Sequence, residues 1–264
     1  MLELARQYAS YYVNAKTKHG VHSPFVFDLI TKVFEDKEVY PDYLVVEKLR
    51  QDLLNNRLIT EVEDFGAGGE KQAVSERKIS DIAARAAKPA RWGKLLYRLC
   101  KYFKPQNMLE FGTSLGITSA YQALGARQGS ESFRFVSLEG SKNLVELAHI
   151  NFKELGIDKD IHLVTGNFDK TLPKVLEDFE RLDYIFIDGN HRKAPTLDYF
   201  NQMLDKAHND TVFIFDDIHW SKEMSEAWDE LKAHPKVTVS IDLFYIGLIF
   251  LRKEQEEEHF VIRF

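Results

Sequence analysis

The stretch MLEFGTSLGITS, residues 108–119, decides the fold. It begins with a short apolar run, continues through a turn between Gly112 and Gly116, and ends in small and apolar residues with helical spacing. A buried strand, a glycine turn and a helix in this order direct backbone N–H groups and a helix N-terminus at a ligand. The stretch therefore predicts a cofactor-binding turn after the first strand of an α/β sheet.

A second glycine-rich stretch, VEDFGAGG at 62–69, is a competing candidate for that turn. The run before it, RLITEVED, has polar residues among its apolar ones, which is unfavourable for a central strand. The residues after it show no apolar stripe until Ile79. We therefore place the cofactor loop at 109–119 and interpret 62–69 as a loop of the N-terminal half, either a lid over the substrate or an ordinary surface turn.

The region after residue 107 alternates short apolar runs with helical patterns. The helical patterns cover 116–126, 141–155, 192–207 and 221–234, and the apolar runs are NMLEF, FRFVSLE, IHLVTG, LDYIFID, TVFIFDD, VTVSIDLF, IGLIFLR and HFVIRF. Such alternation predicts βαβ units with a parallel sheet buried on both faces. We expect an α/β fold with a doubly wound, mostly parallel, seven-stranded Rossmann-like sheet, and an antiparallel element among the last three strands.

The first hundred residues have a different texture. Helical patterns cover Leu2–Val13, Pro24–Phe34, Tyr43–Asn55 and Lys78–Ala87, without a convincing alternating strand. We therefore expect two regions, a helical N-terminal cap that recognises substrate at 1–104 and a cofactor-binding domain at 105–264.

Composition narrows the class of protein. The net charge of −6 argues against a nucleic-acid partner, whose phosphates require dense Lys and Arg. No apolar run approaches the roughly 20 residues that span a bilayer, so no membrane partner is expected. The single cysteine, Cys100, and an N-terminus without a secretory signal pattern favour a reducing, cytoplasmic location. The tyrosine-rich N-terminus is compatible with a homodimer.

Two acidic residues indicate which cofactor the turn binds. The loop from Gly112 to Gly116 lacks the G-x-G-x-x-G spacing of dinucleotide sites. Glu110 precedes it, and the next strand ends in Glu139 and Gly140. A carboxylate at the tip of the second strand is placed to accept hydrogen bonds from ribose hydroxyls. The pattern suits a ligand with a ribose and an ammonium group but no phosphate, which is S-adenosylmethionine.

The same residues carry a family resemblance. LEFGTSLGITS, Glu139 and IDGNH together resemble the class I S-adenosylmethionine-dependent methyltransferases, in particular the small-molecule O-methyltransferases of the catechol and caffeoyl-coenzyme A type and a broader D-G-x-H group. The resemblance extends over residues 91–220. It implies that Ser119 serves the methionine end, that Glu139 holds the ribose, and that Asn167 and Phe168 contact adenine. The full set of implied cofactor-binding residues is Glu110, Gly112, Thr113, Ser114, Gly116, Ser119, Glu139, Gly140, Asn167, Phe168 and Asp188.

Acidic residues and histidines follow two later strands. The fourth strand ends in Asp188-Gly-Asn-His191 and the fifth in Asp216-Asp217-Ile-His219. Because the carboxyl ends of parallel strands share one edge, we expect these side chains to converge. The catalytic candidates are Asp188, His191 and Asp217.

Two mechanisms are open for these residues. In one, Asp188, Asp216 and Asp217 hold Mg²⁺, which lowers the pKa of the acceptor hydroxyl. In the other, no metal takes part, Asp188 contacts the methionine ammonium and His191 is the base.

The expected function is methyl transfer from S-adenosylmethionine to an oxygen of a small-molecule acceptor. Amino-group acceptors on nucleic-acid bases are disfavoured, because enzymes of that type usually carry Asn/Asp-Pro-Pro-aromatic where this chain has Asp-Gly-Asn-His. The alternative is a non-catalytic protein that binds S-adenosylmethionine or S-adenosylhomocysteine in a sensing or assembly role.

Overall fold

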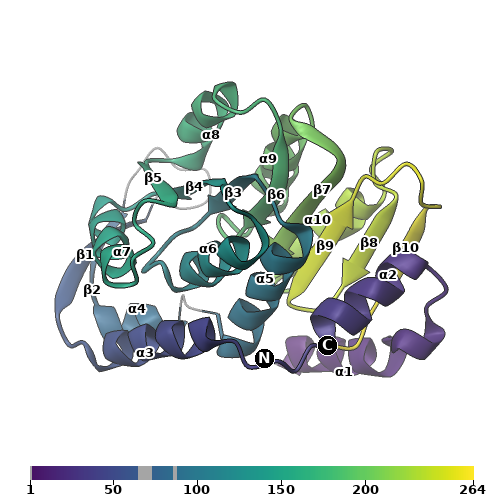
Figure 1. Ribbon diagram of the computed structural model, residues 1–264, viewed down its shortest axis with the longest axis horizontal. Helices are drawn as coiled ribbons and strands as arrows, with labels where there is room; N and C mark the ends of the chain where they lie inside the picture. The colour runs from purple at the N-terminus through teal and green to yellow at the C-terminus, as the bar shows by residue number, and fades with distance from the viewer. Residues whose placement is uncertain (1, 65–72, 86–87) are drawn as a thin grey trace. The chain divides into compact units, whose positions relative to one another are not determined.

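The computed structural model describes residues 2–64, 73–85 and 88–264, which form two compact units (Figure 1). We call Asp36–Asp178 the central unit, and Met1–Glu35 with Phe179–Phe264 the terminal unit. Among the described helices, none has the length and apolar character needed to cross a membrane.

The central unit contains a parallel three-stranded β-structure and a separate hairpin. Its strands β3, β4 and β5 are parallel and adjacent in that order, and β1 pairs with β2 antiparallel. Every residue of β3 and β4 except the first is buried, as a sheet covered on both faces requires. The elements are α3 (Pro41–Asn55), β1 (Ile59–Asp64), β2 (Ala73–Lys78), α4 (Ile79–Arg85), α5 (Ala90–Phe103), β3 (Asn107–Phe111), α6 (Ile117–Gly129), β4 (Arg134–Glu139), α7 (Lys142–Glu154), β5 (Ile161–Thr165) and α8 (Phe168–Glu177).

The terminal unit joins the two ends of the chain. Its strands lie in the order β10-β8-β9-β7-β6, with β9 antiparallel to both neighbours and the other pairs parallel. The Tyr11 hydroxyl donates to the Ile262 carbonyl at 2.5 Å, which ties α1 to the C-terminal residues (Figure 1). The elements are α1 (Leu2–Asn14), η1 (Lys18–Gly20), α2 (Pro24–Leu29), η2 (Ile30–Phe34), β6 (Leu182–Ile187), α9 (Lys193–Met203), β7 (Ala207–Asp216), α10 (Lys222–Lys232), β8 (Val239–Asp242), β9 (Ile246–Phe250) and β10 (Glu258–Val261).

The mixed α/β architecture agrees with the sequence, with two corrections. All eight apolar runs form strands, so the expected number of seven was one too low; the additional strand is β10, whose Phe260 is buried beside β8. The antiparallel element is confirmed for β9, whereas β10 runs parallel to β8. The division at residue 104 stays a prediction.

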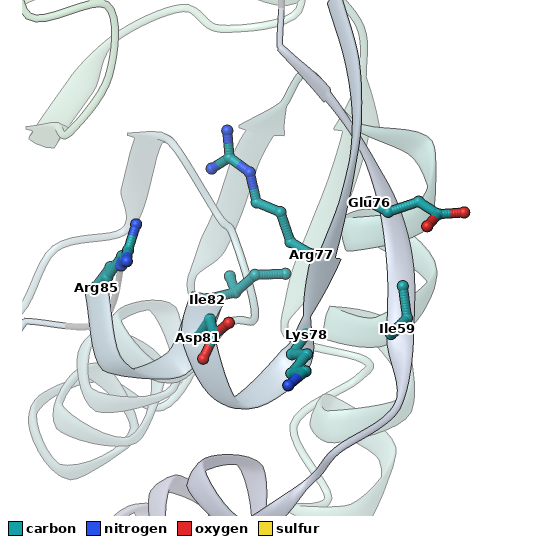
Figure 2. Close-up of a pocket in the computed structure, with 7 residues that line it drawn as sticks. All are labelled: Ile59, Glu76, Arg77, Lys78, Asp81, Ile82 and Arg85. Atoms are coloured by element: carbon teal, nitrogen blue, oxygen red, sulfur yellow. The ribbon is translucent and has the colours of Figure 1, made fainter.

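The hairpin β1–β2 also corrects the expectation that residues 1–104 contain no strand. Among residues 59–63 of β1, whose burial is described, only Val62 is buried, and its neighbours alternate with it toward solvent, which gives a weak sequence signal. A cavity of about 470 Å³ lies where the hairpin meets α4 (Figure 2). Acidic, basic and apolar residues line this cavity: Glu76, Asp81, Arg77, Lys78, Arg85, Ile59 and Ile82. Residues 65–69 of the first glycine stretch lie outside the described residues, and so does the choice between a lid and a surface turn.

Helices α5 and α6 lie side by side in the central unit and approach closely at a glycine (Figure 1). A Cβ atom on Gly125 would lie 2.3 Å from the carbonyl oxygen of Tyr97, and backbone cannot move aside as a side chain can. The two helices can therefore pack this closely only with glycine at position 125.

Replacing Gly125 by alanine is expected to destabilise the protein by about 1–3 kcal/mol, the usual cost of overpacking. Helix propensity alone would stabilise this variant by about 1 kcal/mol, so the two effects have opposite sign. Urea unfolding measures the difference. Gly20→Ala is the control, because its Cβ would meet only Lys16 side-chain atoms at 3.5 Å or more. A Gly125→Ala variant more stable than the wild type would contradict the packing argument.

Four tyrosines cluster where α3, α5 and α6 meet. Their ring centroids are 5.0–5.9 Å apart, and three of the hydroxyls donate to carboxylates at 2.7 Å: Tyr40 to Asp36, Tyr97 to Asp42 and Tyr121 to Glu47. Burial raises the pKa of all four phenols above the ordinary value, that of Tyr43 to about 12.

The cluster predicts a loss of stability at alkaline pH. The folded state binds these protons more tightly than the unfolded chain, whose tyrosines titrate near pH 10. The contribution of Tyr43 is thus complete below about pH 10 and is lost as the pH rises through about 12, and the contributions of the other three are lost at still higher pH. Urea unfolding at a series of pH values should show this decline, and a smaller one for Tyr43→Phe. An equal decline in that variant would rule out a contribution from Tyr43.

Candidate functional site

The turn after β3 adopts a conformation that favours glycine. Gly112 has φ 88° and Gly116 has φ 80°, both in the left-handed region. A Cβ on Gly116 would also lie 2.4 Å from the Phe152 ring. Gly116 is the N-cap of α6 and supplies no side-chain cap, so the helix N-terminus can accept a ligand.

Glu139 fastens this turn to the end of β4. One carboxylate oxygen accepts the Ser114 N–H at 2.8 Å, and the other accepts the Ser141 N–H at 2.9 Å. The side chain is largely buried, with 8% of the residue exposed. A carboxylate can accept about four hydrogen bonds, so Glu139 can hold two amides and ligand hydroxyls together.

Glu110 lies beneath the turn, where it organises a buried network. It is fully buried and accepts hydrogen bonds at 2.5 Å from Ser119, Ser137 and Gln122. Because Ser137 gives its proton to this carboxylate, the Thr113 hydroxyl must be the donor in its 2.5 Å contact with Ser137. The sequence-predicted residues Glu110, Thr113 and Ser119 thus belong to one network, which holds the turn from below.

The predicted adenine contacts follow β5. Asn167 accepts the Asp169 N–H at 2.8 Å and caps α8, a helix that the sequence analysis did not anticipate. Phe168 is partly exposed and packs edge-on against Phe111, with ring centroids 5.4 Å apart. Both residues therefore have structural roles, and their contact with adenine stays a prediction.

A separate polar group occupies the carboxyl ends of β6 and β7 in the terminal unit. Asp188 and His191 approach to 3.4 Å between Oδ1 and Nε2. With Asp216 they present three ligand atoms within 4.8 Å of one another. Asp217 does not belong to this group among the described residues; it has φ 53° and starts a turn in which its carbonyl accepts the Trp220 N–H.

Two carboxylates and one imidazole can hold a divalent cation. The predicted set was Asp188, Asp216 and Asp217 for Mg²⁺; the structure groups Asp188 and Asp216 with His191, and the metal assignment stays a prediction. Imidazole is a poor ligand for Mg²⁺ and a better one for Mn²⁺ or Zn²⁺, so this donor set favours a transition-metal ion.

His219, which the sequence placed with these residues, has other partners. Its Nε2 lies 2.8 Å from Asp242 and its Nδ1 lies 3.2 Å from Ser225. These side chains line a cavity of about 360 Å³ together with α1 and Phe244. Sequence reasoning missed Asp242 and Ser225, because only the pairing of β8 with β9 and the position of α10 bring them to His219.

Comparison with proteins of known families indicates which kind of domain carries these features. Residues 109–218 match a family model described as a methyltransferase domain. This segment is similar to methyltransferase domains. The match begins within β3, just before the glycine turn, and ends just after the strand that carries Asp216, so the matched segment includes both polar groups described above, and the family resemblance inferred from the sequence is confirmed.

Two curated relatives of the methyltransferase domain are named catechol O-methyltransferase. The protein from Niastella koreensis is 28% identical over 48% of this chain and 55% of its own length. The protein from Mycobacterium tuberculosis is 28% identical over 51% of this chain and 58% of its own length. The chain thus spans little more than half the length of the curated relatives that it matches.

A solved structure shows the same fold. The O-methyltransferase from Bacillus cereus, in complex with SAH, matches 86% of this chain and 97% of its own with a TM-score of 0.57 and 19% identity. At that identity the likeness establishes the Rossmann-like methyltransferase fold.

The group formed by Asp188, His191 and Asp216 predicts that Mn²⁺ stabilises the folded protein. It also predicts that the neighbouring residues Asp216 and Asp217 differ in their effect on this stabilisation. At ten times its dissociation constant, Mn²⁺ should stabilise the wild type by about 1.4 kcal/mol. Asp216→Asn should abolish this gain, whereas Asp217→Asn should retain it, because Asp217 is not one of the grouped ligands. Thermal unfolding with and without MnCl₂ measures both. No Mn²⁺ response in the wild type, or its equal loss in both variants, would contradict the assignment.

Proposed function

We propose that this protein is an S-adenosylmethionine-dependent methyltransferase that methylates an oxygen of a small-molecule acceptor. The observation that carries the proposal is Glu139, held at the tip of β4 by the amides of Ser114 and Ser141 within the methyltransferase domain. A carboxylate in this position suits the two hydroxyls of a ribose.

The residues of the central unit fit the proposed cofactor. Gly112 and Gly116 allow the turn its left-handed backbone conformation, and the α6 N-terminus favours the methionine carboxylate. The turn lacks the G-x-G-x-x-G spacing of dinucleotide sites, which disfavours a dinucleotide. S-adenosylmethionine would supply a methyl group on a positively charged sulfur: an oxygen nucleophile forms a bond to the methyl carbon while the C–S bond breaks, and S-adenosylhomocysteine leaves as the neutral thioether. The Bacillus cereus structure in complex with SAH supports this assignment.

The polar group of the terminal unit suits the activation of an acceptor hydroxyl. His191 can take up the hydroxyl proton, since imidazole titrates near neutral pH. Asp188, 3.4 Å away, would then stabilise the imidazolium. Alternatively, Asp188, His191 and Asp216 hold a divalent ion, whose chemistry is to lower the pKa of a bound hydroxyl. The names of the curated relatives support a small hydroxylated acceptor. Nothing in these comparisons favours the non-catalytic alternative.

Calorimetric titration with S-adenosylhomocysteine tests the proposal. The wild type should bind, and Glu139→Ala should bind roughly 10- to 100-fold more weakly, because hydrogen bonds from ribose hydroxyls to a charged group are lost. Glu131→Ala is the control, since it removes an equal charge from the exposed segment before β4. A wild type that gives neither heat nor a thermal shift would refute cofactor binding.

A turnover assay on the same preparation distinguishes an enzyme from a non-catalytic binding protein. Transfer of a labelled methyl group to 1,2-dihydroxybenzene and related phenols should occur in the wild type. His191→Gln should lower kcat about 100-fold or more while leaving the S-adenosylhomocysteine affinity unchanged. Binding without transfer to any acceptor of a broad hydroxyl panel would favour the sensing role.

A further inference from the structure

The hairpin β1–β2 is attached to the turn that follows Glu139. The Glu63 carboxylate accepts the Lys142 N–H at 3.0 Å, and the Glu63 N–H donates to the Ser141 hydroxyl at 3.3 Å. Next to this pair, the Asn143 side-chain amide donates to the Glu61 carbonyl at 3.0 Å. Three consecutive residues, Ser141 and the first two residues of α7, are thus bonded to one strand that lies some eighty residues earlier in the chain.

Through these bonds, Glu63 replaces the local cap of α7. The first amides of a helix lack partners within the helix, and a serine at the N-cap usually accepts one of them. Ser141 occupies the N-cap of α7 but makes no side-chain cap bond, since its hydroxyl serves the Glu63 amide. The Glu63 carboxylate caps Lys142 instead, and its negative charge suits the positive end of the helix dipole.

The N-cap residue of α7, Ser141, lies two positions after Glu139, the residue proposed to bind the ribose. Ser141, whose hydroxyl accepts from Glu63, donates its own N–H to Glu139 at 2.9 Å. Ser141 is fully buried and Glu139 nearly so, and only Gly140 separates them. A shift of the Ser141 backbone would therefore move one of the two amides that set the direction of the Glu139 carboxylate.

We propose that Glu63 is a positioning residue for cofactor binding: by capping α7 and anchoring Ser141, it orients the Glu139 carboxylate toward the ribose hydroxyls. The inference rests on the proposed function. It gives the hairpin a role, because among the described strands β1 and β2 pair with each other alone and yet fix the geometry at the end of β4. Glu63 itself does not touch the cofactor in this arrangement.

The test is calorimetric titration of the full chain with S-adenosylhomocysteine, together with its 2′-deoxy analogue. Glu63→Ala should weaken S-adenosylhomocysteine binding about tenfold, the loss expected when one hydrogen bond to a charged group is misdirected. Glu63→Gln should recover most of the affinity, because its amide oxygen can still accept the Lys142 N–H. Glu76→Ala, which removes an exposed carboxylate from the partner strand of the same hairpin, should bind like the wild type.

The 2′-deoxy analogue separates positioning from a general loss of stability. If Glu63 acts through Glu139 and the ribose, the ratio of wild-type to Glu63→Ala affinity should be clearly smaller for the analogue than for S-adenosylhomocysteine. A purely structural effect would weaken both ligands by the same factor, and that result would overturn the inference.

The remaining outcomes are also decisive. Equal affinity of wild type and Glu63→Ala for S-adenosylhomocysteine overturns the positioning role and leaves the proposed function intact. A wild type that does not bind refutes the proposed function itself. Should Glu63→Ala fail to fold, Ser141→Ala takes its place: it keeps the N–H that reaches Glu139 but removes the anchor for Glu63, and wild-type affinity in this variant would equally overturn the inference.

Discussion

The bonds from the Ser114 and Ser141 amides to the Glu139 carboxylate are the interaction on which the cofactor site depends. They join two loops that follow neighbouring parallel strands, so the turn after β3 and the start of α7 cannot move independently. A buried carboxylate needs such partners, since without them its desolvation would be too costly. The requirement for stability and the requirement for a directed ribose acceptor are therefore met by the same two amides.

Two carboxylates support the glycine turn. Glu110 is satisfied from below by neutral hydroxyl and amide donors, and Glu139 from the side by backbone N–H groups. Neutral donors stabilise an ionised carboxylate while leaving the local charge negative. A turn in such surroundings suits a ligand with positive charge and sugar hydroxyls. The glycine spacing of the turn separates S-adenosylmethionine from dinucleotides, because dinucleotide sites also carry an acid after the second strand.

Local sequence was sufficient for the strands and for the turn, because buried parallel strands are continuous apolar runs and because Gly112 and Gly116 have a conformation that other residues resist. It was insufficient where tertiary contacts decide. Val62 is the only buried residue among residues 59–63 of β1, so the hairpin lacked a pattern, and nothing near Glu63 in the sequence points to Lys142. His219 was assigned to the acidic group by its position after β7, yet Asp242 and Ser225 draw it elsewhere. Asp217 was included for the same positional reason, whereas the residue grouped with Asp188 and Asp216 is His191.

A crystal structure of the protein with S-adenosylhomocysteine tests the central claim most directly. The account predicts both ribose hydroxyls within hydrogen-bond distance of the Glu139 carboxylate, with the Ser114 and Ser141 amides still bonded to it and Gly112–Gly116 unchanged in backbone conformation. A ribose bound away from Glu139, or a carboxylate that releases both amides to reach it, would contradict the account.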